Sequence, residues 1–194
     1  MISYFISILS SVLAVLGCVY LVAATILTHR FRRTAPARPR TPTAGVTILK
    51  PLHGEEPRLF ENLASFCTQD YPGPVQIVFG VQDPGDGAIA IVERLRAEHG
   101  TRHLDLVIDA TMHGLNRKVS NLVNMWRHAE HEIVIVADSD MRVDPDYISR
   151  VIAELEEGDG AAVTCLYHGL ASTGIWAELA ALGINEHLDR KSVV

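Results

Sequence analysis

Two carboxylates stand one residue apart in the stretch EIVIVADSDMR, which covers positions 132–142. Asp138 and Asp140 flank Ser139 and follow a run of five apolar residues, IVIVA. Carboxylate oxygens are preferred ligands of Mg²⁺ and Mn²⁺, and Mg²⁺ is commonly held by one or two carboxylates together with substrate phosphates. Acids that directly follow a strand also begin turns. The pair therefore predicts either a metal site or a turn. The position of the pair relative to the neighbouring strands and helices distinguishes the two.

Two other segments carry residues suited to binding a nucleotide. Asp83 lies in QDPGD, where its carboxylate can either accept hydrogen bonds from a nucleobase or a ribose, or close a turn. For Asp86, in the same segment, we expect the turn role. Lys118 lies in GLNRKVSNL at the expected start of a helix. A helix N-terminus with a nearby lysine favours phosphate, although lysines are also common on helix surfaces. The segment does not match the Walker pattern, and Ser139 lacks the surroundings of a hydrolase nucleophile.

Strands and helices are predicted to alternate around these residues. Apolar runs predict strands at 46–50, 75–81, 103–109, 132–137 and 161–167. Helical spacing and end signals predict helices at 58–69, 88–100, 117–130, 145–158 and 173–188, with Trp126 and Trp176 in the core. This order favours an α/β fold with a mostly parallel sheet, whose ligands bind at the carboxyl ends of the strands. We therefore expect PLHGEEP, QDPGD and DSD to meet at one edge.

An apolar segment precedes this domain. Residues 2–28 hold no charged side chain and are long enough to cross a hydrocarbon core of about 30 Å as a helix. Five arginines and no acid occur in residues 1–45, all after the apolar run, whereas a cleaved signal peptide puts its basic residues first. We expect a transmembrane helix at 1–28 and a basic, Pro-rich linker at 29–45. The positive-inside rule then puts the N-terminus outside and the soluble domain in the cytoplasm.

Charge and cysteine content exclude several classes of protein. The formal net charge is −6, and because residues 1–45 contribute +5, the remainder carries −11. Nucleic-acid binding needs clustered lysines and arginines, so we expect no nucleic-acid partner. Three widely spaced cysteines form neither a disulfide framework nor a zinc pattern. We expect the nine histidines to be solvated or isolated side chains rather than metal ligands.

Four motifs together carry a resemblance to a known family. With ILKPLHGEEP, QDPGD, GLNRKVSNL and VADSDMRVDPDY in this order, the sequence resembles the membrane-anchored family 2-like glycosyltransferases of the ceramide glucosyltransferase type. More narrowly, it is similar to the bacterial hopanoid-associated branch, which transfers N-acetylglucosamine from its UDP form to bacteriohopanetetrol. The resemblance implies a GT-A-like sandwich over residues 46–194 that binds a UDP-sugar donor with Mg²⁺ or Mn²⁺. It also implies a lipid acceptor such as a hopanoid or ceramide, and a location at the inner membrane.

The resemblance also implies roles for individual residues. Asp83 would contact the uracil, Asp138 and Asp140 would form the metal-binding D-x-D, and Asp138 would also lie near the ribose or diphosphate. The other implied donor-binding residues are Pro51, Gly54 and Glu55 in the first nucleotide loop, and Lys118 near the diphosphate.

Two family features are missing from the sequence. The family has a third aspartate, its catalytic base, and a later Q/R-x-x-R-W motif, and neither has a convincing counterpart here. We therefore expect an N-terminal fragment of a metal-dependent, inverting hexosyltransferase. The alternative is a non-catalytic or truncated nucleotide-sugar-binding membrane protein. A nucleotidyltransferase is the third possibility and ranks last, because its N-terminal loop would usually be Gly-rich and basic, whereas PLHGEEP is acidic.

Overall fold

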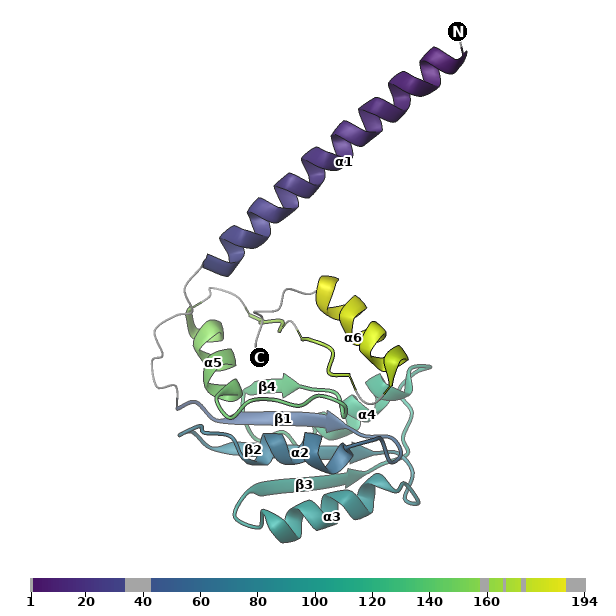
Figure 1. Ribbon diagram of the computed structural model, residues 1–194. Coiled ribbons are helices and arrows are strands. Elements are labelled where there is room, and N and C mark those ends of the chain that lie inside the picture. Colours follow the sequence, from purple (N-terminus) through teal and green to yellow (C-terminus); the bar gives the residue numbers. More distant parts are fainter. Residues whose placement is uncertain (1, 34–42, 158–160, 166, 172–173, 188–194) are drawn as a thin grey trace. The chain divides into compact units, whose positions relative to one another are not determined.

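The computed structural model describes residues 2–33, 43–157, 161–165, 167–171 and 174–187 of the 194-residue chain (Figure 1). The chain divides into two compact units. One unit takes in residues 39–164 and contains the sheet. The other takes in residues 1–38 together with residues 165–193.

The first of these units is built on a four-stranded parallel sheet. Its strands are β1 (Val46–Pro51), β2 (Val75–Val81), β3 (His103–Ile108) and β4 (Ile133–Val136), in the order β3-β2-β1-β4. All six residues of β1 are buried, as expected for a central parallel strand covered on both faces. The predicted α/β class and the mostly parallel sheet are confirmed.

Helices cover both faces of this sheet. They are α2 (Leu59–Cys67), α3 (Ala88–Glu98), α4 (Arg117–Trp126) and α5 (Tyr147–Glu157). The chain moves outward from β1 to β3 and then returns to the other side of β1, so right-handed crossovers put α4 on the face opposite α2 and α3 (Figure 1). Helix α5 joins the α2 face, where the rings of Tyr147 and Phe66 meet edge to face with centroids 5.8 Å apart.

The core on the α4 face is tightly packed. Leu49, Val78 and Val107 from three strands surround Met125 of α4. Gly80 of β2 allows this close approach, because a Cβ atom at its position would lie 2.3 Å from Met125 Sδ. Helix α4 is thereby held directly above β1 and β2.

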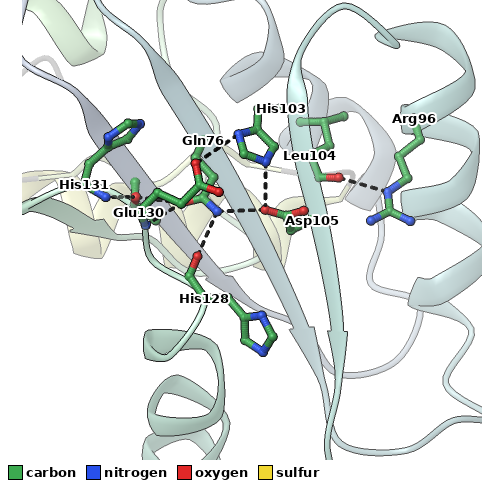
Figure 2. Close-up of polar contacts among 9 residues, drawn as sticks. Gln76, Arg96, His103, Leu104, Asp105, His128, Glu130 and His131 are labelled. Atoms are coloured by element: carbon green, nitrogen blue, oxygen red, sulfur yellow. Dashed lines mark hydrogen bonds and ion pairs between the residues drawn. The ribbon is translucent and has the colours of Figure 1, made fainter.

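The amino ends of the strands carry a polar network centred on Gln76 (Figure 2). Its Nε2 donates to Asp105 Oδ2 at 2.7 Å and to the His128 carbonyl at 2.8 Å. His103 lies between Asp105 and Glu130, with its ring nitrogens 3.3 and 3.5 Å from the two carboxylates. Within the described part of the chain no three His, Cys, Asp or Glu side chains form a group that could hold a metal ion. The network therefore links β2, β3 and the segment that leads into β4.

The second unit contains two helices, α1 (Ile2–Arg33) and α6 (Ile175–His187). The segment Tyr4–Leu27 of α1 has a mean hydropathy of 2.4 and is long and apolar enough to cross a membrane. Helix α1 continues into the predicted linker as far as Arg33, and the rest of that linker up to residue 42 lies outside the described residues.

Two sequence predictions are wrong. Residues 161–165 and 167 form no strand, and residues 161–164 are exposed, because an apolar run becomes a strand only where a partner strand offers its edge. Trp126 and Trp176 are not in the core but are 59% and 81% exposed. The apolar spacing identified helices correctly, yet spacing alone does not say which face of a helix is buried.

Candidate functional site

A cavity of about 360 Å³ opens at the carboxyl ends of the strands. Its walls come from the ends of β1, β2 and β4 and from the first turns of α4. The lining residues are Pro51, Leu52, His53, Glu56, Gln82, Arg117, Lys118, Asn121, Asp138, Ser139 and Asp140. Its volume lies in the range usual for small-molecule sites, about 300–1,000 Å³. The predicted edge is therefore where the cavity forms.

Asp138 is the first acid of the DSD segment and is held by two lysines. Its carboxylate Oδ1 accepts a hydrogen bond from Lys118 Nζ at 2.6 Å, and both side chains are half exposed. Its backbone carbonyl accepts hydrogen bonds from Lys50 Nζ and from the Met141 N–H group. The segment after β4 is therefore fixed both from α4 and from β1.

Ser139 and Asp140 point in different directions. Ser139 is buried, and its hydroxyl donates to Glu56 Oε2 at 2.8 Å, which ties the DSD segment to the loop after β1. Asp140 is exposed and lines the cavity. Among the residues that the structure describes, no hydrogen bond or ion pair engages the Asp140 carboxylate. This carboxylate is therefore the one most available to a cation.

Lys50 lies beneath the DSD segment and is completely buried. Its ammonium group sits 3.9 Å from the centre of the Phe66 ring, a cation–π contact with α2. Burial lowers the pKa of Lys50 from 10.5 to about 7, although the negative charges of Asp138, Asp140 and Glu56 act in the opposite direction. A charge buried in this way is costly unless it is paired, and the acids near Lys50 offset only part of that cost.

Asp86 anchors the loop that follows β1. Gly54 adopts a positive φ of 72°, and its N–H group donates to both carboxylate oxygens of Asp86 at 3.0 and 2.9 Å. The same carboxylate accepts from the Ala88 N–H group at 2.9 Å, at the start of α3. Neither Gly54 nor Glu55 lines the cavity; Glu56 does, and Glu55 lies against Gly87.

Asp83 is exposed in the turn that follows β2. Its Oδ1 accepts from the Gly85 N–H group at 2.8 Å, the geometry of a side-chain-closed turn. It does not line the cavity, whereas its neighbour Gln82 does. The structure thus shows the turn role of Asp83, and its nucleobase role stays a prediction.

Comparison with known proteins identifies the family. The model of glycosyl transferase family 21 matches residues 9–194. The chain belongs to glycosyl transferase family 21. Among curated relatives, ceramide glucosyltransferase 1 of Caenorhabditis elegans is 29% identical over 145 residues, which cover 71% of this chain and 31% of that protein. Ceramide glucosyltransferase of Gibberella zeae is 29% identical over 169 residues, covering 78% and 32%. The chain thus spans about a third of these relatives.

Solved structures support the same fold. Mannosyltransferase PcManGT from Pyrobaculum calidifontis, in complex with GDP-Man and Mn²⁺, has a TM-score of 0.58 and 25% identity, covering 79% of this chain and 46% of that one. The crystal structure of S. aureus TarS 1-349 has a TM-score of 0.51 and 23% identity, covering 68% and 38%. The family 21 chain therefore has a GT-A-like fold.

The cavity of this family 21 chain suits a metal ion that shares its ligands with a substrate. Asp138 and Asp140 offer hard oxygen ligands, but the described residues contain no group of three acidic, His or Cys side chains that could enclose an ion. Mg²⁺ typically completes its coordination with waters and substrate phosphates. Two carboxylates that line the cavity together with Lys118 and Arg117 fit that pattern.

Sequence reasoning missed several residues of this site. Lys50, Glu56, Gln82, Arg117 and Asn121 were not predicted as site residues, although four of them line the cavity and Lys50 supports it. A lysine at the end of VTILK, a mostly apolar predicted strand, was the available signal for Lys50. No local signal marked Asn121, whose Nδ2 donates to the Gly80 carbonyl at 2.8 Å in the folded domain.

We expect Asp86→Ala to destabilise the fold and weaken ligand binding at the cavity together. The substitution removes the acceptor for two N–H groups, so the free energy of unfolding should fall by about 1–2 kcal/mol. The loop it releases carries Pro51, Leu52 and His53 of the cavity wall. Urea unfolding followed by circular dichroism measures the first effect, and titration with UDP measures the second. Asp86→Asn keeps one acceptor oxygen and should lose less stability. Equal stability of Asp86→Ala and wild type would contradict this anchoring role.

Proposed function

We propose that this family 21 chain is the donor-binding part of a membrane-anchored hexosyltransferase. It binds a UDP-sugar, with N-acetylglucosamine or glucose as the sugar, and transfers the sugar to a hydroxyl group of a membrane lipid such as a hopanoid or ceramide. The relatives named ceramide glucosyltransferase support the lipid acceptor and the hexose. The resemblance to the hopanoid-associated branch supports N-acetylglucosamine and a hopanoid.

The observation that carries the proposal is the meeting of the DSD acids with Lys118 and Arg117 at one cavity. Carboxylates that hold a cation and basic groups on the first turn of a helix are the two features that a nucleotide diphosphate needs. Both occur at the carboxyl edge of a parallel sheet, where α/β proteins bind ligands.

Each residue then has a specific task. Asp138 and Asp140 would hold a Mg²⁺ or Mn²⁺ ion, which supplies charge neutralisation of the departing UDP. Lys118 is placed to move from the Asp138 carboxylate to the diphosphate, and Pro51 borders the nucleotide. Gly54, Glu55 and Asp83 belong to the two loops that would surround the uridine. The lipid hydroxyl would attack the anomeric carbon from the opposite side, which inverts its configuration. We assign no catalytic base to the described residues.

The membrane part of the proposal rests on α1 and on the charges that follow it. Residues 1–28 would span the inner membrane, residues 29–45 would form a basic linker, and residues 46–194 would form the donor-binding domain. Apolar length supports the span, and the arginines after it favour the cytoplasmic side for the domain.

Calorimetric titration of the full chain with UDP in detergent micelles tests donor binding. We expect UDP to bind at least about 10-fold more tightly with Mn²⁺ than with EDTA, because the ion joins the acids to the diphosphate. UMP is the matched control: it keeps the base and ribose but lacks the second phosphate, so its affinity should respond much less to Mn²⁺. Metal-independent UDP binding would contradict the proposal. Transfer from UDP-glucose and UDP-N-acetylglucosamine to ceramide and hopanoid acceptors then tests the chemistry.

A further inference from the structure

Helix α4 exposes three apolar side chains and buries three polar ones. Val119, Val123 and Trp126, here named the α4 stripe, lie at positions i, i+4 and i+7 of one helix face and are 53%, 36% and 59% exposed. The buried residues of the opposite face include three polar ones, Ser120, Asn121 and Asn124. A helix that packs on a sheet normally turns its apolar stripe inward. Beside Met125, the inner face of α4 is therefore polar, and its outer face carries an apolar stripe.

Hydrogen bonds fix this orientation. Asn124 Nδ2 donates to the carbonyls of Asp109 and Thr111 at 3.0 and 3.1 Å, and Asn121 Nδ2 donates to the Gly80 carbonyl. Rotating α4 to bury the stripe would break all three bonds and leave buried polar groups without partners. The outward direction of the α4 stripe is therefore a property of the fold.

The charge around the α4 stripe differs from that of the rest of the domain. Residues 46–157 hold 10 basic and 19 acidic side chains. The segment 110–129, which contains α4, has Arg117, Lys118 and Arg127 and no acid. Arg117 and Arg127 are exposed at the two ends of the helix. An apolar stripe with a tryptophan, flanked by arginines, matches the composition of helices that lie in the interface of anionic bilayers.

We propose that the α4 stripe docks on the surface of an anionic lipid bilayer. Trp126 would sit at the headgroup level, where tryptophan is enriched, and Arg127 would meet lipid phosphates. This inference rests on the proposed function, in which the chain is held at a membrane and its acceptor is a lipid. The first turns of the same helix supply Arg117, Lys118 and Asn121 to the cavity. Docking through α4 therefore brings lipid hydroxyls to the edge of the donor site.

Tryptophan quenching in vesicles tests this surface directly. The chain has two tryptophans, so Trp176→Phe leaves Trp126 as the only one. The full chain with this substitution is reconstituted into vesicles of phosphatidylcholine and phosphatidylglycerol, with and without bromine atoms on the acyl chains. We expect blue-shifted Trp126 emission that the brominated lipid quenches at least about twofold, since an interfacial helix buries its apolar face at the acyl boundary. Equal emission in the two kinds of vesicle would overturn the proposal.

Matched variants separate the stripe from the rest of the domain. Adding Val119→Asp and Val123→Asp in the same background should remove the quenching without lowering the unfolding midpoint, since both side chains are exposed. Ala90→Asp adds a charge to an exposed position of α3 and should leave the quenching intact. Blue-shifted emission that no lipid quenches and that depends on protein concentration would instead assign the stripe to a second copy of the chain.

The proposed function and this inference fail in different ways. UDP titration of the same vesicles reports the donor site. Lost Mn²⁺-dependent UDP binding with intact Trp126 quenching would contradict the proposed function alone. Intact UDP binding without quenching would contradict docking through α4 alone.

Discussion

Asp140→Ala is expected to abolish Mn²⁺-dependent UDP binding while leaving the fold intact. The carboxylate is exposed at the cavity, and no hydrogen bond or ion pair engages it among the described residues. Removing it should therefore change the free energy of unfolding of the metal-free domain little. It takes away one of the two DSD carboxylates that we propose hold the ion. Mutating even an outer-shell partner of a metal typically lowers metal affinity about 10–100-fold. We therefore expect the affinity for UDP in the presence of Mn²⁺ to fall by at least about 100-fold. Calorimetry with UDP and Mn²⁺ measures it.

Two further variants make this result specific to the site. Glu132→Gln removes one exposed negative charge just before β4, at the other end of that strand from the DSD segment, and should leave UDP affinity unchanged. Asp140→Asn keeps the size and one oxygen of the side chain but not its charge, and should bind as weakly as Asp140→Ala. If Asp140→Ala bound UDP with the wild-type response to Mn²⁺, the D-x-D role of this residue would be wrong.

The regular elements of the sheet domain were predictable because their signals are local. The run 75–81 is rich in apolar and β-branched residues and is bounded by turn formers, and it forms β2 with the same bounds. The prediction for 161–167 failed because a strand also needs a partner edge, which no local pattern contains. The order of the elements and the DSD acids predicted that the site lies at the carboxyl edge of the sheet. The cavity lies at that edge.

The residues that sequence reasoning missed owe their positions to tertiary contacts. Lys50 ends an apolar strand, and a charge at a strand end normally marks the exit to solvent. Its burial depends on Phe66 of α2 and on the Asp138 carbonyl, which lie 16 and 88 residues further along the chain. The polar inner face of α4 has the same origin, because its asparagines are held by hydrogen bonds to the loop after β3 and to β2. Amphipathic spacing predicts the helix but not which face packs.

Lys50→Ala is expected to be the most destabilising single substitution at the site. Lys50 is among the largest completely buried side chains, and its truncation leaves a void beside Phe66 and an Asp138 carbonyl without its lysine partner. Truncating a large buried side chain to alanine costs about 2–5 kcal/mol through the cavity that it leaves, so the free energy of unfolding should fall by roughly that amount. Urea unfolding in detergent micelles measures it. Lys50→Met keeps most of the volume without the charge and should lose much less stability.

The pH dependence of stability distinguishes the buried charge from the buried volume. The pKa of Lys50 is about 7 in the folded state and 10.5 in the unfolded reference. Below pH 7 both states hold the proton, and the folded state bears the full cost of the buried ammonium group. Between pH 7 and 10.5 only the unfolded chain holds it, so the wild-type free energy of unfolding should rise with pH, by roughly 3–5 kcal/mol in all. Measured in EDTA, Lys50→Met should lack this rise. Parallel profiles for the two proteins would mean that Lys50 is not a buried cation and that packing alone holds the DSD segment.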